Sequence, residues 1–514
     1  SFNVSGSSLN RFRADVFGKS SADDLEYDKD TGIDEANATA EQIMEYLMGK
    51  DNFGISSKYD GDLAYRIVVV RYAMLGNRFA RYKEVKIAAD VSDKTVAYVN
   101  EHMDTLSGIS VNEDMIRKYN YSEYFSSIIG YTGPISESEY TALHKKNKDY
   151  TQNDTVGKAG MEQYYETYLR GKNGERKFYI DNVGRISEII SSTDSVAGDD
   201  LYLSIDADLQ MATYLALQNE IAAIVYSNIK SGEIPINDVY TALIGNSVIN
   251  TEHFSKSKAS DTEKSVLSVF KSRQKTTLGK IKQELTSSPE ALNTMSDEVL
   301  DEFTYIISML KDDQVLLKNE IDTSDSVYQK WKDQKISPKE YLNYCITQHW
   351  IDISQLNVDE KYADSTEVYD ALCKYILKNI KTDTEFSKII YQYMITRGEI
   401  SPRQLCLILF DQGVLDYDDA TVNKLKNGSL SPRDFLMKKI YNIEITPAQL
   451  ALEPCTGSCV VTDEKTGEIR AMVSYPGYNS NKLANGVDSE YFASLQHDKS
   501  SPLLNYATQQ KTAP

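Results

Sequence analysis

Two acidic residues four positions apart are the first candidates for chemistry. Glu162 and Glu166 fall on a predicted helix, Met161 to Leu169, so both carboxylates are expected on one face. A pair of carboxylates is what a glycoside hydrolase uses. However, cationic residues accompany the pair in sequence or in motif: Arg117, Lys158, Arg170 and Lys172. Because ionic networks often imitate catalytic sites, we expect Glu162 and Glu166 to form structural ion pairs that join parts of the protein.

Metal chemistry has weaker support. The segment DKDTGID contains Asp28, Asp30 and Asp34, but its glycine has the wrong offset for a calcium loop and the distal glutamate geometry is absent, so we expect a solvated acidic loop. Neither the five histidines nor the cysteines have zinc spacing; the cysteines are Cys345, Cys373, Cys406, Cys455 and Cys459. Cys455 and Cys459 could pair in an oxidising compartment, although free, mostly buried thiols fit the odd count better. We predict no metal and no cofactor.

The composition limits the class of protein. With 514 residues, 41% of them apolar and 26% charged, the sequence is typical of a globular chain of about three domains. A net charge of -20 argues against a nucleic-acid partner, which requires a basic surface. The apolar run Ile67 to Val70, like the other apolar runs of the sequence, is far shorter than the roughly 18 residues of a membrane span. Because the sequence opens at Ser1 without a signal-like segment, we expect that an N-terminal anchor has been lost.

The elements that must position these residues change in character along the chain. Up to about residue 115 short strands and helices mix, and one helix is well marked by a capping box at Thr39–Gln42 and a closing Gly49. From about 231 to 450 helical periodicity dominates, and the hydroxyl–proline pairs that begin helices are Ser288-Pro289, Ser337-Pro338, Ser401-Pro402, Ser431-Pro432 and Thr446-Pro447. Ser337 to Glu340 is predicted to form a full capping box.

A β-hairpin is predicted after the helical segment. Cys459–Thr462 and Glu468–Ser474 have strand character, and Gly467 permits the turn between them.

Four stretches, taken together and in order, resemble one family. They are Arg117-Lys118-Tyr119 with IIGYTG (128–133), VGKAGMEQYYETYLRGKNG (156–174), GDDLYLSIDADLQ (198–210), and TGEIRAMVSYPGYNSN (466–481) running on to PLLNYATQQKTAP. In this combination the sequence is similar to the class B penicillin-binding proteins, the monofunctional D,D-transpeptidases of peptidoglycan synthesis. Two positions depart from the family pattern: Asn120 stands where proline is usual, and Ser127 where histidine is common.

The resemblance implies an α+β multidomain fold with three parts. Residues 1–200 would be a mixed α/β pedestal, or dimerisation domain. Residues 201–230 and 451–514 would be the first helix and β-hairpin of a β-lactamase-like transpeptidase domain, in which Ser204-Ile205 ends a strand and Asp206 begins a helix. Residues 231–450 would be an all-α insertion.

The motif residues of the pedestal are expected to be structural rather than catalytic. They are Arg117, Tyr119, Gly130, Tyr131, Gly133, Gly157, Gly160, Glu162, Glu166, Arg170 and Gly171. Any one of these glycines alone could simply be a turn residue.

The resemblance also implies where the nucleophile lies. In the family, a stretch like NYATQQKTAP runs into Gly-Ser-Thr-x-Lys, whose serine is acylated with help from the lysine one helical turn on. We therefore expect the catalytic serine two residues beyond Pro514, and this chain to be an inactive fragment.

Three short stretches within the chain match catalytic motifs of penicillin-recognising enzymes, and we expect these matches to be coincidental. Ser268 to Lys271 and Ser272 to Lys275 fit Ser-x-x-Lys but fall in the polar helical segment, and Lys465-Thr466-Gly467 falls in the hairpin turn.

The resemblance and the helical insertion lead to two alternative hypotheses for the function. The first is a membrane-anchored, extracytoplasmic transpeptidase that cross-links peptidoglycan stem peptides through a serine acyl-enzyme and is acylated by β-lactams. The alternative is a non-catalytic scaffold that recruits membrane proteins of cell-wall assembly through the pedestal and the helical insertion. A β-lactam sensor fits less well, because sensors lack the pedestal.

Overall fold

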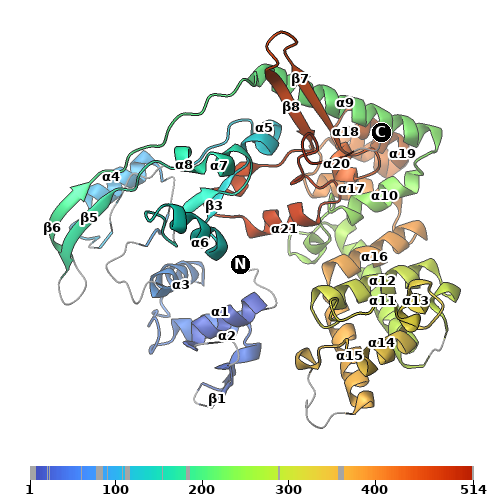
Figure 1. Ribbon diagram of the computed structural model, residues 1–514. Coiled ribbons are helices and arrows are strands. Elements are labelled where there is room, and N and C mark those ends of the chain that lie inside the picture. The colour runs from blue at the N-terminus through green and yellow to red at the C-terminus, as the bar shows by residue number, and fades with distance from the viewer. Residues whose placement is uncertain are drawn as a thin grey trace. The chain divides into compact units, whose positions relative to one another are not determined.

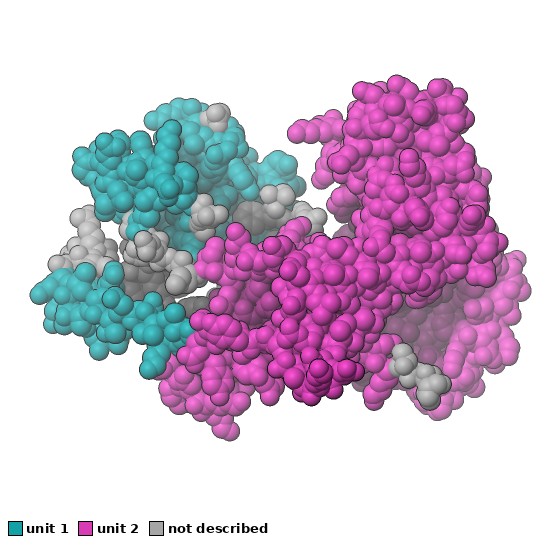
Figure 2. All heavy atoms as spheres, turned by 90° about the horizontal axis from the view of Figure 1, so that it is seen from above, with its two compact units in different colours: residues 1–115, 171–198 teal, residues 116–170, 199–514 magenta. Residues whose placement is uncertain are grey.

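The computed structural model shows a protein made mainly of helices (Figure 1). It describes residues 7–19, 21, 24–29, 31–59, 61–76, 85–88, 91–106, 108–109, 111, 116–152, 154–180, 186–287, 290–356 and 364–511. The chain divides into two compact units, coloured separately in Figure 2: unit 1 comprises residues 1–115 and 171–198, and unit 2 comprises residues 116–170 and 199–514. The described strands form four antiparallel sheets of two strands each, so the fold is a mixture of many helices with small sheets. The domain boundaries expected at 200, 230 and 450 stay a prediction.

Unit 1 is built around short helices with a small apolar core. Its elements are α1 (Ser7–Phe17), β1 (Tyr27–Asp28), β2 (Ile33–Asp34), η2 (Glu35–Asn37), α2 (Ala40–Met48), α3 (Gly61–Gly76), α4 (Asp93–Glu101), β5 (Glu175–Ile180) and β6 (Ile186–Thr193). The buried side chains of its core are Val16, Ala38, Ile43, Leu47 and Val68. The capping box predicted at Thr39–Gln42 is confirmed, because both reciprocal bonds are present.

The acidic segment DKDTGID folds into the tight β1–β2 hairpin. Lys19 lies nearby, with its Nζ 3.0 Å from the Glu35 carboxylate and 3.4 Å from that of Glu26. Asp30 lies outside the described residues, and among those that are described no cluster of three or more His, Cys, Asp or Glu residues could hold a metal ion.

Unit 2 begins with short elements and continues into a long run of helices. The short elements are α5 (Ser122–Ile129), β3 (Thr132–Pro134), α6 (Glu137–Lys146), β4 (Thr155–Gly157), α7 (Gly160–Tyr164) and α8 (Glu166–Leu169). The helices that follow are α9 (Ala207–Ser231), α10 (Ile236–Gly245), α11 (Asp261–Thr286), α12 (Asp297–Asp312), α13 (Ser326–Lys332), α14 (Pro338–Thr347), α15 (Ser365–Ile380), α16 (Thr384–Thr396), α17 (Pro402–Asp411), α18 (Asp419–Asn427), α19 (Pro432–Tyr441) and α20 (Pro447–Leu450). The unit closes with β7 (Gly457–Thr462), β8 (Ile469–Tyr475), η6 (Ser480–Lys482) and α21 (Ser489–His497).

The helix starts predicted from hydroxyl–proline pairs are confirmed at four positions. The side chains of Ser337, Ser401, Ser431 and Thr446 each accept a backbone N–H in the first turn, and the proline occupies the first helical position. At Ser337 the prediction was too strong: its hydroxyl accepts from the Glu340 N–H, but the return bond from the Glu340 side chain is missing from the described contacts. Ser288 and Pro289 lie outside the described residues.

The helices end in a recurrent turn that also explains their packing. At Gly398, with φ +74°, the chain turns into the left-handed region, and the fully buried Ile400 follows two residues later. The same arrangement recurs at Ile443 with Ile445, where the Ile445 N–H bonds back to the Lys439 carbonyl. Each turn therefore ends one helix, buries an aliphatic side chain and places the cap of the next helix.

One continuous apolar cluster runs through the helices of unit 2. It includes Leu243, Phe303, Ile390 and Leu409 of the helical segment, and it extends to Val225 of α9 and to Val473 and Tyr475 of β8. Of the cysteines, Cys345, Cys373, Cys406 and Cys455 are buried; all five, including Cys459, are free thiols, as the odd count indicated.

The hairpin β7–β8 is confirmed and lies along α9 (Figure 1). Gly467, with φ +74°, ends the turn as predicted. The strand expected at Ser204-Ile205 is wrong: these residues are irregular. The Ser204 hydroxyl donates to the Ile469 carbonyl at 2.8 Å and the Asp206 N–H donates to the Arg470 carbonyl at 2.9 Å. Two bonds hold the segment beside β8, which is too few for a strand, and Asp206 then caps α9 as expected.

No helix within the described ranges combines the length and apolar character needed to cross a membrane.

Candidate functional site

Most of the predicted motif residues gather in the first part of unit 2. Arg117 to Arg170 of the motif belong to this unit, whereas Gly171 begins a segment of unit 1. The structure therefore brings ten of the predicted residues into one unit, around α5, α7 and the β3–β4 pair.

Glu162 is a buried acceptor that Arg117 and Tyr119 share. The Nε of Arg117 lies 3.1 Å from Glu162 Oε1, and the Tyr119 hydroxyl donates to the same oxygen at 3.3 Å. The Tyr119 hydroxyl in turn accepts the Thr132 N–H at 3.0 Å. Burial raises the pKa of Glu162, although Arg117 opposes this, and burial raises the pKa of Tyr119 to about 12. The predicted ion pair of Glu162 is therefore present.

Glu166 binds a different set of partners. Its carboxylate accepts the Gly157 N–H at 2.7 Å and the Tyr150 hydroxyl at 3.2 Å. The Arg170 guanidinium stacks on the Tyr150 ring, 3.8 Å from its centroid, and forms its ion pair with Asp154 at 2.5 Å. Glu166 therefore holds Gly157 and Tyr150 through hydrogen bonds and does not form the expected ion pair among the described contacts.

The single helix predicted from Met161 to Leu169 is wrong. The segment breaks at Tyr165, where φ is -103° and ψ is 19°, and forms the two short helices α7 and α8. The two carboxylates bind separate partners, but Glu166 is still close enough to Glu162 to contribute to its raised pKa. Of the other expected cations, Lys158 pairs with Glu139 at 2.5 Å and Lys172 makes backbone bonds to Val196.

Gly130 and Gly160 lie back to back where the two parts of the motif meet. Both have positive φ, +79° and +58°. A Cβ on Gly130 would lie 2.0 Å from the Ala159 carbonyl oxygen, and one on Gly160 would lie 2.5 Å from the Ile128 carbonyl oxygen. Only glycine satisfies the backbone conformation and the contact together.

The other motif residues form the small sheet beside this contact. Gly133 pairs with Val156 and Thr132 pairs with Gly157 across β3 and β4. The Tyr131 carbonyl accepts the Lys158 N–H at 2.8 Å. The Tyr131 ring meets the Tyr478 ring edge-on at 6.2 Å, so the motif touches a segment more than 300 residues away.

Two asparagines that the sequence did not single out attach this motif to the segment after the hairpin. Asn481 accepts the Tyr119 N–H at 2.8 Å and donates to the Tyr119 carbonyl at 2.9 Å. Asn485 bonds to both backbone groups of Arg117 in the same way, at 3.0 and 2.6 Å. Their spacing of four residues is the only sequence signal, and nothing in the sequence connects them with residues 117–119.

Helix α5 makes the second half of this connection. The Ser126 hydroxyl accepts the Tyr478 N–H at 3.0 Å, and the Tyr478 hydroxyl donates to the Ser126 carbonyl at 3.2 Å. The Ser122 hydroxyl accepts the Ser480 N–H at 2.6 Å. We call the bonds between residues 117–127 and residues 478–485 the motif seam.

Gln210 joins the same region to the hairpin. Its side chain is fully buried and bonds to both backbone groups of Met472, at 2.8 and 3.0 Å. The same amide donates to the Tyr124 carbonyl of α5 at 2.8 Å. One side chain of α9 therefore binds β8 and α5 at once.

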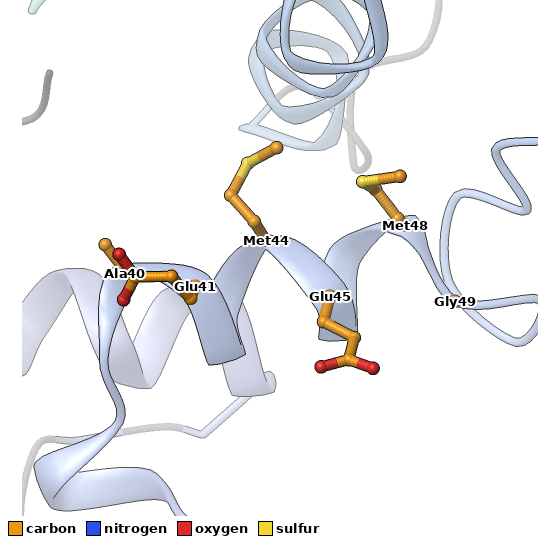
Figure 3. A pocket seen from close by; sticks show the side chains of 6 residues that line it. All are labelled: Ala40, Glu41, Met44, Glu45, Met48 and Gly49. Atoms are coloured by element: carbon orange, nitrogen blue, oxygen red, sulfur yellow. The ribbon is translucent and has the colours of Figure 1, made fainter. Parts of the chain in front are cut away.

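The short patterns judged coincidental lie on the surface. Ser268, Lys271, Ser272 and Lys275 are exposed on α11, and Lys465 is exposed in the hairpin turn. A hollow along α2 of unit 1 is lined by the residues labelled in Figure 3, where Met44 and Met48 extend from one side of the helix and Glu45 from the other. Its lining contains no serine, cysteine, histidine or lysine, and its two carboxylates, on Glu41 and Glu45, are exposed, so we do not regard it as a reaction site.

Comparison with known proteins identifies the motif region. Residues 18–203 match the penicillin-binding protein dimerisation domain. The peptidoglycan D,D-transpeptidase MrdA of Salmonella typhimurium is 28% identical over 157 residues, 30% of this chain and 25% of the relative. Penicillin-binding protein 2A of Bacillus subtilis is 33% identical over 136 residues, 26% of this chain and 19% of the relative. MrdA of Acinetobacter baumannii is 30% identical over 152 residues, 30% of this chain and 22% of the relative.

Residues 18–203 thus match the dimerisation domain of penicillin-binding proteins, and part of the chain is similar to proteins named peptidoglycan D,D-transpeptidase and penicillin-binding protein 2A. It spans about a quarter or less of the length of these curated relatives.

Proposed function

We propose that the intact protein is a peptidoglycan D,D-transpeptidase that cross-links stem peptides on the outer face of the plasma membrane. The observation that carries this proposal is the likeness to relatives named peptidoglycan D,D-transpeptidase, in a region where the motif residues make specific contacts. In the proposed reaction a serine Oγ attacks the carbonyl of a D-Ala-D-Ala bond and D-Ala leaves. An amine of a neighbouring stem peptide then attacks the acyl-serine and frees the enzyme.

The structure supports the proposal through the position of the hairpin. Strand β8 packs on α9, which is far from it in the sequence. Apolar side chains of α9 and β7 are nevertheless exposed, including Leu215 at 43% and Val460 at 47%. In this proposal, further parts of the catalytic domain would cover these side chains.

In this proposal the nucleophile follows Pro514 and residues 1–514 alone do not react. The motif residues of the pedestal then have a structural role, and a β-lactam acylates the same serine as the substrate does. Membrane proteins of cell-wall assembly are the partners that this location would supply.

A scaffold function is the alternative, and one observation favours it. The helices from α10 to α19 lie outside the matched residues 18–203, yet they form most of the apolar cluster of unit 2. In this alternative the helical segment would supply the binding surface.

Intact-mass measurement after exposure to penicillin tests the proposal. We expect an adduct on a chain that carries the natural sequence beyond Pro514 and none on residues 1–514. An adduct on neither chain would contradict the transpeptidase and favour the scaffold. An adduct on residues 1–514 would show that Ser268, Ser272 or another serine within them is the nucleophile.

A further inference from the structure

The segment before the proposed nucleophile is organised around one side chain. The Asn505 carbonyl accepts the Gln509 N–H at 2.8 Å, and the Asn505 Oδ1 accepts the Ala507 N–H at 3.1 Å. The Asn505 N–H donates to the Gln509 side chain at 3.1 Å. Residues 505–509 therefore form a closed turn in which Asn505 uses both backbone groups and its side-chain oxygen.

Two bonds attach this turn to the rest of unit 2. The Asn505 Nδ2 donates to the Ser127 carbonyl near the end of α5, at 3.0 Å. The Tyr506 N–H donates to the Ser474 Oγ of β8 at 2.9 Å, and the same hydroxyl donates to the Leu504 carbonyl at 3.3 Å. Ser474 is 3% exposed, so its hydroxyl is confined to these partners.

The two attachments come from elements that are themselves fixed. Helix α5 is held by the motif seam, and β8 is held by β7 and by Gln210. The turn at 505–509 is thus fixed from two directions, a few residues before Pro514.

We propose that Asn505 and Ser474 are positioning residues, which hold the segment that carries the nucleophile in register with α5 and β8. This inference rests on the proposed function. Displacing a reacting atom by about 1 Å can cost roughly a hundredfold in rate, so a loose turn would slow acylation without abolishing binding.

The test uses the intact protein and compares Ser474→Ala with Ser474→Thr. We expect Ser474→Ala and Asn505→Ala to lower the rate constant of acylation by penicillin about tenfold or more, with little change in the affinity of the preceding complex. Ser474→Thr keeps a hydroxyl on β8 and is expected to restore most of the rate. Ser458→Ala, at the exposed position paired with Ser474 on β7, is the matched control and is expected to react as the unmodified protein does.

The substitution Asn505→Asp distinguishes the role of Asn505 within the turn from its role in attaching the turn to α5. Aspartate still accepts the Ala507 N–H but cannot donate to the Ser127 carbonyl, so it is expected to be as slow as Asn505→Ala. Folded variants at Asn505 and Ser474 that are acylated within twofold of the unmodified protein would overturn the inference, with thermal unfolding used to show that each variant is folded.

A second measurement keeps the inference distinct from the proposed function. In residues 1–514, hydrogen exchange of the Tyr506 and Ala507 amides is expected to accelerate in Asn505→Ala and, for Tyr506, in Ser474→Ala. Unchanged exchange would contradict the positioning role even if penicillin acylates the intact protein. Accelerated exchange in residues 1–514, together with an intact protein that penicillin does not acylate, would overturn the proposed function, and with it the positioning of a nucleophile.

Discussion

At the scale of single residues, the most unusual group is Glu302 of α12. It is 1% exposed, and its Oε2 has no hydrogen-bond partner among the described residues. Its neighbour Glu298 takes the available cations, with Arg273 at 3.1 Å and Arg397 at 2.5 Å. Burial, reinforced by Glu298, raises the pKa of Glu302 to about 8.

The raised pKa of Glu302 predicts that the free energy of unfolding decreases as the pH rises. The folded state keeps the proton up to about pH 8, whereas the unfolded chain releases it near 4.5. The free energy of unfolding should therefore decrease by up to about 1.4 kcal/mol per pH unit across that interval, and level off above it. Glu302→Gln should remove this slope and raise the melting temperature at pH 8.5, with little effect at pH 5.

Thermal unfolding between pH 5 and 9 measures this, with Glu320→Gln at an exposed position as the control. A slope that is unchanged in Glu302→Gln would contradict the assignment.

At the scale of elements, two glycines illustrate opposite constraints. Gly130 ends α5 with φ +79° against the Ala159 carbonyl, whereas Gly279 lies in the exposed middle of α11 with open space around it. The glycine at 130 is required by a tertiary contact, and the one at 279 only weakens its helix.

Alanine substitution at the two positions should have opposite signs. Gly130→Ala is expected to destabilise the protein by about 2 kcal/mol or more, because it combines left-handed strain with a clash against backbone. Gly279→Ala is expected to stabilise it by about 0.5–1 kcal/mol. Urea unfolding followed by circular dichroism measures both, and a neutral Gly130→Ala would show that the α5–α7 contact is loose.

At the scale of the whole molecule, the two units differ in the size of their cores. Unit 1 has the small cluster around Ile43 and Val68, whereas unit 2 has the cluster that runs from α9 through α19 to β8. Because buried apolar area is the main source of stability, the two units should unfold separately.

We expect unit 1 to lose structure at a lower concentration of denaturant than unit 2. Hydrogen exchange in urea should show the amides of α2 exchanging before those of α10 and α16. Leu47→Ala should move only the early transition, and Leu243→Ala only the late one. A single transition shared by all amides would contradict this expectation.

Local patterns were sufficient for much of the fold. The capping box at Thr39, the caps at Ser401 and Thr446, and the hairpin closed by Gly467 each depend on interactions within a few residues, which the sequence records directly. The predicted helix from 161 to 169 and the strand at 204–205 were wrong: the helix breaks at Tyr165, and the two hydrogen bonds between residues 204–206 and β8 are too few for a strand.

The sequence by itself therefore determined the family resemblance, the helix starts and the motif residues. Only the tertiary structure decided how the motif is used. Asn481, Asn485 and Asn505 bind backbone groups of residues 117–127, more than 350 positions away. A backbone carbonyl is the same in every residue, so its partner leaves no mark on the sequence and is chosen when the chain folds.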